Sequence, residues 1–123
     1  MEPVVLVVDD SVAIRKILRR VLRQTGIEIK DIHEAGDGQE ALSVLKQHKV
    51  DLVLSEINMP NMDGLQLLAA LKASWELSVI PVVMITTEGS ERKVAEAVRL
   101  GAVGYVRKPF TADQIREKLV GFL

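Results

Sequence analysis

Short apolar runs alternate along the chain with segments in which apolar residues recur every three or four positions. The first run, Val4–Val8, is continuous and mostly β-branched, which predicts a strand buried on both faces. Apolar side chains then recur at helical spacing, at Ile14, Ile17, Leu18, Val21 and Leu22. Gly26 lies just past this stripe, where a glycine commonly ends a helix. The chain therefore begins with a strand that is followed by a helix.

The same alternation continues to the end of the chain. Further strands are predicted at 29–34, 52–54, 80–85 and 103–106, and further helices from Asp37, around 65–71, at 90–100 and from Thr111. Glu40 follows Asp37 and Gln114 follows Thr111 at the spacing of a capping box. Five strands alternating with five helices predict an α/β fold with a five-stranded parallel sheet, doubly wound as (βα)5. Ligands of such folds bind beyond the carboxyl ends of the strands.

Length, charge and composition narrow the class of protein. The chain has 123 residues, so we expect a single domain over 1–123 with no output domain attached. The net charge of −1 gives no reason to expect nucleic acid or an anionic membrane as a partner. No apolar run approaches the roughly 20 residues of a membrane span, and the chain has no cysteine. These features predict a cytoplasmic, monomeric protein without disulfides.

Chemically active side chains follow four of the predicted strands. Asp9 and Asp10 follow the first, Glu56 the third, Thr86 the fourth and Lys108 the fifth. Grouped carboxylates repel one another unless a cation lies between them, and Mg²⁺ prefers carboxylate, water and phosphate oxygens. Lys108 and Thr86 are suited to bind other oxygens of a phosphate. The structural alternative is that Asp9 and Asp10 cap the first helix and that Lys108 is a solvated loop residue.

Four segments, in order along the chain, resemble a known family. Val7–Ser11, Asn58–Gly64, Thr86 and Tyr105–Phe110 are similar to the motifs of CheY-like response-regulator receiver domains of the stand-alone chemotaxis type. The resemblance runs essentially from end to end. It implies a flavodoxin-like, CheY-like fold and a role in two-component signal transduction, in which an aspartyl phosphate and Mg²⁺ switch partner binding. The implied partners are a sensor histidine kinase or phosphotransfer domain and a downstream target, such as a flagellar motor switch.

The resemblance implies a metal site at the first and third strand ends. Asp10 would bind Mg²⁺ directly, and Asp9 would bind it largely through water. Glu56 and the backbone carbonyl of Asn58 would be further ligands. Asn58 and Glu88 occupy positions that tune dephosphorylation rates in the family.

Other matching residues would transmit the phosphorylation signal. Thr86 and Lys108 would contact the phosphoryl group, and Tyr105 would be the aromatic switch that turns inward when Thr86 moves. The Lys108–Pro109 peptide bond would be cis, a geometry that proline makes accessible.

Glu56 departs from the family, in which the phosphate-accepting residue at this position is Asp. Glutamate keeps the charge but moves the carboxylate outward by roughly 1.5 Å. Misplacement by about 1 Å can slow a reaction by around 100-fold. Receivers catalyse only their own phosphotransfer and dephosphorylation, so the chain is not predicted to be an enzyme. We expect little or no normal phosphotransfer to Glu56.

Three interpretations of Glu56 stay open. It is an engineered replacement that imitates the phosphorylated state, a natural substitution that fixes the receiver in one state, or a residue that is still phosphorylated, but poorly. The longer side chain would approach Thr86 and Lys108 in place of a phosphoryl group. The alternative function is a protein-interaction module that works without phosphorylation.

Two further features of the surface carry expectations. Basic residues crowd the first predicted helix, at Arg15, Lys16, Arg19, Arg20 and Arg23. They form either a solvated helix face or a docking surface for an acidic or phosphohistidine-bearing partner. Trp75 is expected near the end of the third helix and partly buried.

Overall fold

Strands and helices alternate through residues 2–87 and 89–123, the part of the chain that the computed structural model describes. The strands are β1 (Val4–Val8), β2 (Asp31–Ala35), β3 (Leu52–Ser55), β4 (Val82–Thr86) and β5 (Gly104–Arg107). The helices are α1 (Val12–Gln24), α2 (Gly38–Gln47), α3 (Gly64–Ala73), α4 (Glu91–Arg99) and α5 (Ala112–Phe122). Every predicted element is present, and the strand ends agree with the predicted ones to within two residues.

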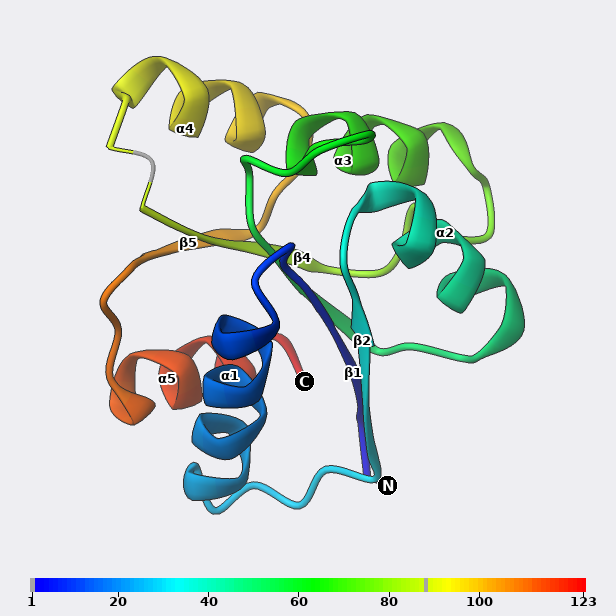
Figure 1. Ribbon diagram of the computed structural model, residues 1–123. Coiled ribbons are helices and arrows are strands. Elements are labelled where there is room, and N and C mark those ends of the chain that lie inside the picture. The colour runs from blue at the N-terminus through cyan, green and yellow to red at the C-terminus, as the bar shows by residue number, and fades with distance from the viewer. Residues whose placement is uncertain (1, 88) are drawn as a thin grey trace.

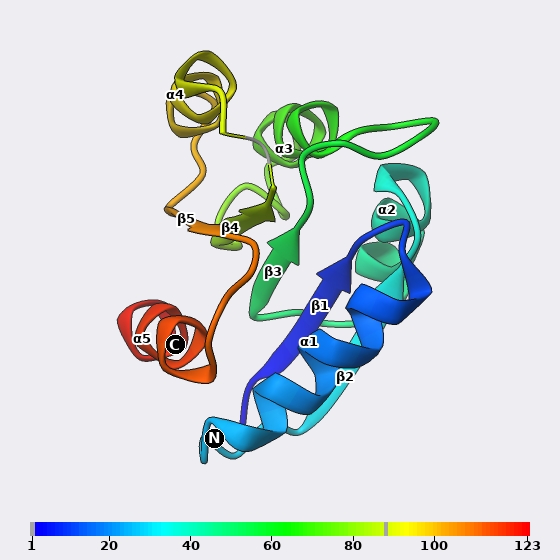
Figure 2. The same cartoon turned by 60° about the vertical axis from the view of Figure 1, so that its left-hand side comes forward.

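The strands form one parallel sheet in the order β2-β1-β3-β4-β5. The direction of winding changes at β1, because the chain first moves outward to β2 and then returns past β1 to β3. Helices α1 and α5 lie on one face of the sheet, and α2, α3 and α4 lie on the other (Figures 1 and 2). The prediction of a doubly wound α/β fold with a five-stranded parallel sheet is confirmed.

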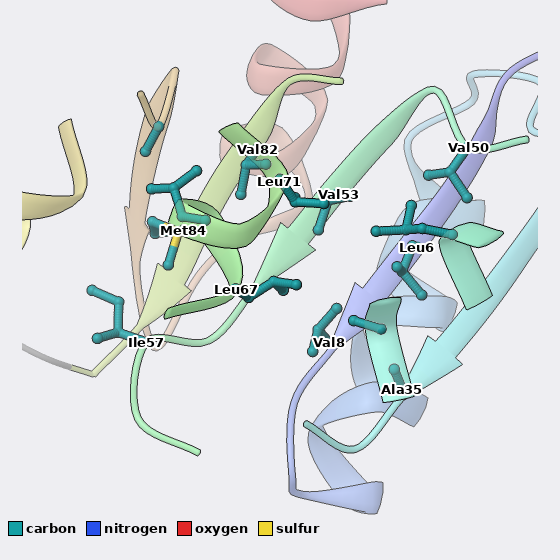
Figure 3. Close-up of a cluster of buried hydrophobic side chains, with 14 of the residues drawn as sticks. Leu6, Val8, Ala35, Val50, Val53, Ile57, Leu67, Leu71, Val82 and Met84 are labelled. Atoms are coloured by element: carbon teal, nitrogen blue, oxygen red, sulfur yellow. The ribbon is translucent and has the colours of Figure 1, made fainter. Parts of the chain in front are cut away.

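The sheet separates two apolar layers. Leu6 and Val8 of β1 pack into the layer beneath α2, α3 and α4 (Figure 3), whereas Val5 and Val7 pack against α1 and α5. Successive side chains of a strand point to opposite faces, so a strand covered on both sides needs apolar residues at every position. Burying one such side chain contributes about 1.5–3 kcal/mol. The continuous apolar runs in the sequence have this origin.

Side chains cap the starts of four helices. The capping residues are Ser11, Asp37, Asp63 and Thr111. Each accepts a hydrogen bond from the backbone N–H three residues further on, which satisfies one of the free donors of a first turn. Thr111 and Gln114 form the predicted capping box. Gly26 and Gly101, with φ of 79° and 107°, follow the ends of α1 and α4 in the left-handed region that glycine tolerates best.

Trp75 lies just after the end of α3, as predicted, but the prediction that it is partly buried is wrong, since the residue is 90% exposed. The turn after α3 directs Leu77 and Ile80 against the core and leaves Trp75 outside.

No helix within residues 2–87 and 89–123 has the length and apolar character needed to cross a membrane.

Candidate functional site

The carboxyl ends of the strands bring the predicted polar residues to one edge of the sheet. Asp9 follows β1, Glu56 follows β3, Thr86 ends β4 and Lys108 follows β5. Asp9, Glu56 and Thr86 are only 2%, 6% and 0% exposed. Buried polar groups of this kind need partners within the protein. The structure provides them by placing Asp9, Glu56 and Lys108 in direct contact.

Lys108 joins the two buried carboxylates. Its Nζ lies 2.6 Å from Oδ2 of Asp9 and 2.8 Å from Oε1 of Glu56, and its side chain is 11% exposed. Burial by itself lowers the pKa of the Lys108 ammonium, but hydrogen bonds and charges from Asp9 and Glu56 outweigh it, and the pKa is raised. Lys108 is therefore a partly buried cation paired with two buried carboxylates, and the interpretation of Lys108 as a solvated loop residue is wrong.

The other carboxylate oxygen of Glu56 faces the backbone. Oε2 accepts hydrogen bonds from the N–H groups of Ile57 at 2.7 Å and Asn58 at 3.3 Å. The N–H of Gly64 donates to the carbonyl of Ile57 at 2.8 Å, so the start of α3 lies against this turn. A Cβ atom at Gly64 would collide with the carbonyl oxygen of Glu56. The Glu56 carboxylate thus reaches Lys108, as expected, and both of its oxygens are engaged.

Asp9 and Asp10 have different environments although they are adjacent. Oδ1 of Asp9 accepts from the N–H of Ser11 at 2.9 Å, and the N–H of Asp9 donates to the carbonyl of Ala35 at 3.0 Å. The side chain that caps α1 is Ser11, so the alternative in which Asp9 and Asp10 cap this helix is wrong. Asp10 is exposed, and its carboxylate makes no hydrogen bond or ion pair with residues 2–87 or 89–123.

The remaining predicted site residues lie on β4, on β5 and in the segments after β3 and β5. Thr86 is fully buried, and Tyr105 is half-buried against the apolar layer beneath α4. Asn58 is exposed, and its Oδ1 accepts a hydrogen bond from Nζ of Lys93 on α4 at 3.0 Å. The Lys108–Pro109 peptide bond is cis, as the resemblance implied. Glu88 lies outside the described residues.

The chemistry of this edge suits Mg²⁺. Lys108 pairs with Asp9 and Glu56, and the neighbouring Asp10 adds a third carboxylate, so these four side chains carry an excess of negative charge. All candidate ligands are oxygens, and the Asp10 carboxylate is open to solvent. Within the described ranges no three Asp, Glu or His side chains already converge on one point. The donor set fits Mg²⁺, which is usually bound by one or two carboxylates together with water.

Arg15, Arg19 and Arg23 of α1 turn toward β2 and the loop before it. Arg15 and Arg19 bind the two oxygens of Glu34 at 2.9 and 3.1 Å. Arg19 and Arg23 donate to the carbonyls of Ile32 and Ile29. These three residues are not simply a solvated helix face. Sequence reasoning missed Glu34, although the four-residue repeat of the arginines, which gives them one face of α1, was a signal that they share a partner.

An apolar hollow of about 290 Å³ lies beside Lys108. It is lined by Ile14, Ile17, Thr87, Lys108, Pro109 and Phe110. Its lining comes from α1 and from the segments that follow β4 and β5, so it borders the same strand ends as the buried ion pairs.

Comparison with known proteins gives one consistent result. The family described as response regulator receiver domain matches residues 5–120. Chemotaxis protein CheY-3 of Vibrio cholerae is 42% identical over 115 residues, which cover 94% of this chain and 87% of the relative. Chemotaxis protein CheY of Pseudomonas aeruginosa is 39% identical over 115 residues, covering 94% and 91%.

Solved structures agree with the sequence matches. CheY4 of Vibrio cholerae superposes with a TM-score of 0.88 at 33% identity, covering 100% of both chains. CheY in a CheX-CheY-BeF3-Mg²⁺ complex from Borrelia burgdorferi has a TM-score of 0.85 at 32% identity, covering 96% of this chain and 87% of that one. These matches include the strand ends that carry Asp9, Glu56, Thr86 and Lys108.

Proposed function

We propose that this chain, which belongs to the response regulator receiver family and is CheY-like, is a cytoplasmic two-component switch with Glu56 at its phosphate-accepting position. The observation that carries the proposal is the contact of Glu56 with Lys108. It places a carboxylate at the end of β3, buried, next to Asp9 and a cation. A phosphate-accepting side chain needs these surroundings, because phosphoryl transfer depends on positioning and on positive charge near the transferred oxygens.

Glu56 changes what this pocket does. Oε1 accepts from Lys108, and Oε2 accepts from the N–H groups of Ile57 and Asn58, so these contacts hold the carboxylate one methylene beyond the position of an aspartate carboxylate. The carboxylate occupies a position on Lys108 that a phosphoryl oxygen would otherwise take. It therefore imitates one contact of the phosphorylated state, without the second negative charge of a phosphate. Phosphotransfer to Glu56 is accordingly impaired.

Mg²⁺ is the cofactor that receivers of the CheY type generally use, and a similar CheY structure contains it. In this chain Asp10 and Asp9 would hold the ion, with Glu56 and the backbone carbonyl of Asn58 as further ligands. The bound ion would supply the positive charge that balances the excess of carboxylates. Lys108 keeps Asp9 and Glu56 in place and neutralises part of their charge.

The phosphate donor is a sensor histidine kinase or a phosphotransfer domain, and the apolar hollow beside Lys108 is the surface on which it docks. Exposed Ile17 and the neighbouring Phe110 suit an apolar helix face, and Lys108 borders the hollow. A charge introduced by Ile17→Asp is expected to slow transfer from the kinase to a Glu56→Asp background while leaving phosphorylation by acetyl phosphate unchanged. Equal slowing of both reactions would contradict this docking surface. The downstream partner is a protein, and a similar CheY has been solved in a complex with the protein CheX.

The decisive experiment restores the family residue. In the presence of Mg²⁺ and acetyl phosphate, Glu56→Asp should become phosphorylated at least about 100-fold faster than the parent, because its carboxylate regains the in-line position. Intact-protein mass spectrometry measures the reaction, and Glu56→Gln is the control that has no nucleophilic carboxylate. Equal phosphorylation of the parent and Glu56→Asp would overturn the assignment of Glu56.

A second candidate function is a receiver that binds its target without phosphorylation. Both oxygens of the Glu56 carboxylate accept hydrogen bonds from within the protein, which favours this function, since Lys108 has a partner there without a phosphoryl group. Beryllofluoride with Mg²⁺ distinguishes the two, because a phosphate-dependent switch changes its amide NMR spectrum when the analogue binds. If the parent and Glu56→Asp both bind Mg²⁺ and neither responds to the analogue, the second function holds.

A further inference from the structure

Arg15 contacts two parts of the chain that are distant in sequence. Its Nε donates to Oε1 of Glu34 on β2 at 2.9 Å, and its Nη1 donates to the backbone carbonyl of Asp9 at the end of β1. The Arg15 side chain is only 16% exposed. A guanidinium is planar and rigid, so two simultaneous contacts fix its orientation. Arg15 thereby links the sheet edge at β2 to the loop that carries the predicted metal ligands.

The anchor for this contact is a charged carboxylate. Burial raises the pKa of Glu34, but hydrogen bonds and charges from Arg15 and Arg19 outweigh it, and the pKa is lowered. Glu34 therefore stays ionised and binds both guanidinium groups. Arg19 shares Glu34, but its other contact is the carbonyl of Ile32 within β2, away from the Asp9–Asp10 loop.

The carbonyl of Asp9 also determines the position of Asp10. A peptide unit is planar, so the carbonyl of Asp9, the N–H of Asp10 and the two Cα atoms move together. The N–H and the carboxylate of Asp9 are held by Ala35, Ser11 and Lys108. The carbonyl is the remaining polar atom of Asp9, and Arg15 binds it. The direction in which the Asp10 side chain leaves the backbone thus depends on this contact.

We propose that Arg15 is a positioning residue that orients the Asp9–Asp10 peptide, and with it the carboxylates that hold Mg²⁺. This inference rests on the proposed function, since it gives Arg15 a role at the same site. It distinguishes Arg15 from Arg19, which has the same charge and the same carboxylate partner but does not touch the loop. Groups that orient metal ligands typically change metal affinity by about 10–100-fold when they are removed.

The test compares Arg15→Met with Arg19→Met in the full chain. Isothermal titration with MgCl₂ should give an affinity reduced by about 10–100-fold for Arg15→Met and within about 2-fold of the parent for Arg19→Met. The Mg²⁺ affinity of Arg15→Lys should fall between those of the two methionine variants, because one ammonium group cannot reproduce the two contacts of the guanidinium. Urea unfolding identifies any general loss of stability, and the comparison is made at equal folded fraction.

A second measurement needs no metal. The backbone N–H resonance of Asp10 in a ¹⁵N-labelled sample should shift in Arg15→Met and stay in place in Arg19→Met. An unchanged Asp10 resonance in Arg15→Met, or equal loss of Mg²⁺ affinity in the two variants, overturns the inference. A parent that binds no Mg²⁺ contradicts the metal site of the proposed function, and the inference about Arg15 as a positioning residue for Mg²⁺ then fails with it. Binding by the parent with equal behaviour of the variants refutes the role of Arg15 alone.

Discussion

Removal of Lys108 tests the buried ion pairs most directly. Lys108→Met keeps a chain of similar length but leaves Asp9 and Glu56 without their shared cation, at side-chain exposures of 3% and 7%. Removing one partner of a buried ion pair typically costs about 3–5 kcal/mol. Two carboxylates lose their partner here, so we expect a decrease of about 4 kcal/mol in the free energy of unfolding. Domains of this kind have about 5–15 kcal/mol in total, so the variant should still fold.

Urea unfolding in the presence of EDTA measures this decrease at pH 7. The matched control is Lys16→Met, which removes an exposed lysine of α1 and should change stability by less than about 0.5 kcal/mol. In the Lys108→Met background, Glu56→Gln removes one of the two carboxylate charges that no longer have a cation. It should therefore recover part of the lost free energy of unfolding. Added Mg²⁺ should stabilise Lys108→Met more than it stabilises the parent, because a divalent cation replaces the missing ammonium.

The pH dependence of the free energy of unfolding tests the ion pairs of Lys108 independently. The pKa of Lys108 is raised in the folded protein, so its contribution is complete below its ordinary pKa of 10.5 and is lost as pH rises through the raised value. The parent should therefore lose stability at strongly alkaline pH through this group, and Lys108→Met should not. A Lys108→Met variant within about 1 kcal/mol of the parent, with the same alkaline profile, would refute the buried ion-pair reasoning.

Two further predictions follow from the surroundings of the site. Gly64→Ala should lower the free energy of unfolding in urea by about 3 kcal/mol or more, because its Cβ would meet the backbone at Glu56. The control is Gly121→Ala in α5, where a Cβ meets nothing within 4 Å. This control should be neutral or stabilising. The pKa of Glu34 is lowered below its ordinary 4.5, so its contribution is present above that pH and is lost as pH falls through the folded value. Acid unfolding of Glu34→Gln should show a shallower pH dependence below about 4.5 than the parent, and an identical slope would contradict the pairing.

The fold followed from the sequence because each element carries its own signal. The apolar run Val4–Val8 predicts a buried strand without reference to the rest of the chain, and Thr111 with Gln114 predicts a helix start in the same local way. The strand ends were less certain, as β2 begins at Asp31 and not at Ile29. Ile29 is buried but lies just before the strand, so its apolar character reports packing and not strand pairing.

The site was predictable only in part. That Asp9, Glu56 and Lys108 meet could be inferred, because parallel strands place their carboxyl ends at one edge. The two hydrogen bonds from the backbone to Oε2 of Glu56 could not, since they depend on the side-chain torsions of one residue. The contact of Arg15 with Glu34 joins a helix to a strand 19 positions away, and no local pattern encodes that pairing.

The sheet divides the interior so that residues adjacent in sequence pack into different layers. Val5 and Leu6 are adjacent in sequence, but one packs against α1 and α5 and the other beneath α2, α3 and α4. Substitutions more than about 7–10 Å apart that share no partner usually combine additively, and side chains in different layers and on different strands meet this condition most readily. Changes in one layer can therefore accumulate without compensating changes in the other. A receiver built in this way can alter the helices on one side of the sheet, and with them the proteins that it contacts there, while the opposite layer continues to hold the strand ends in place.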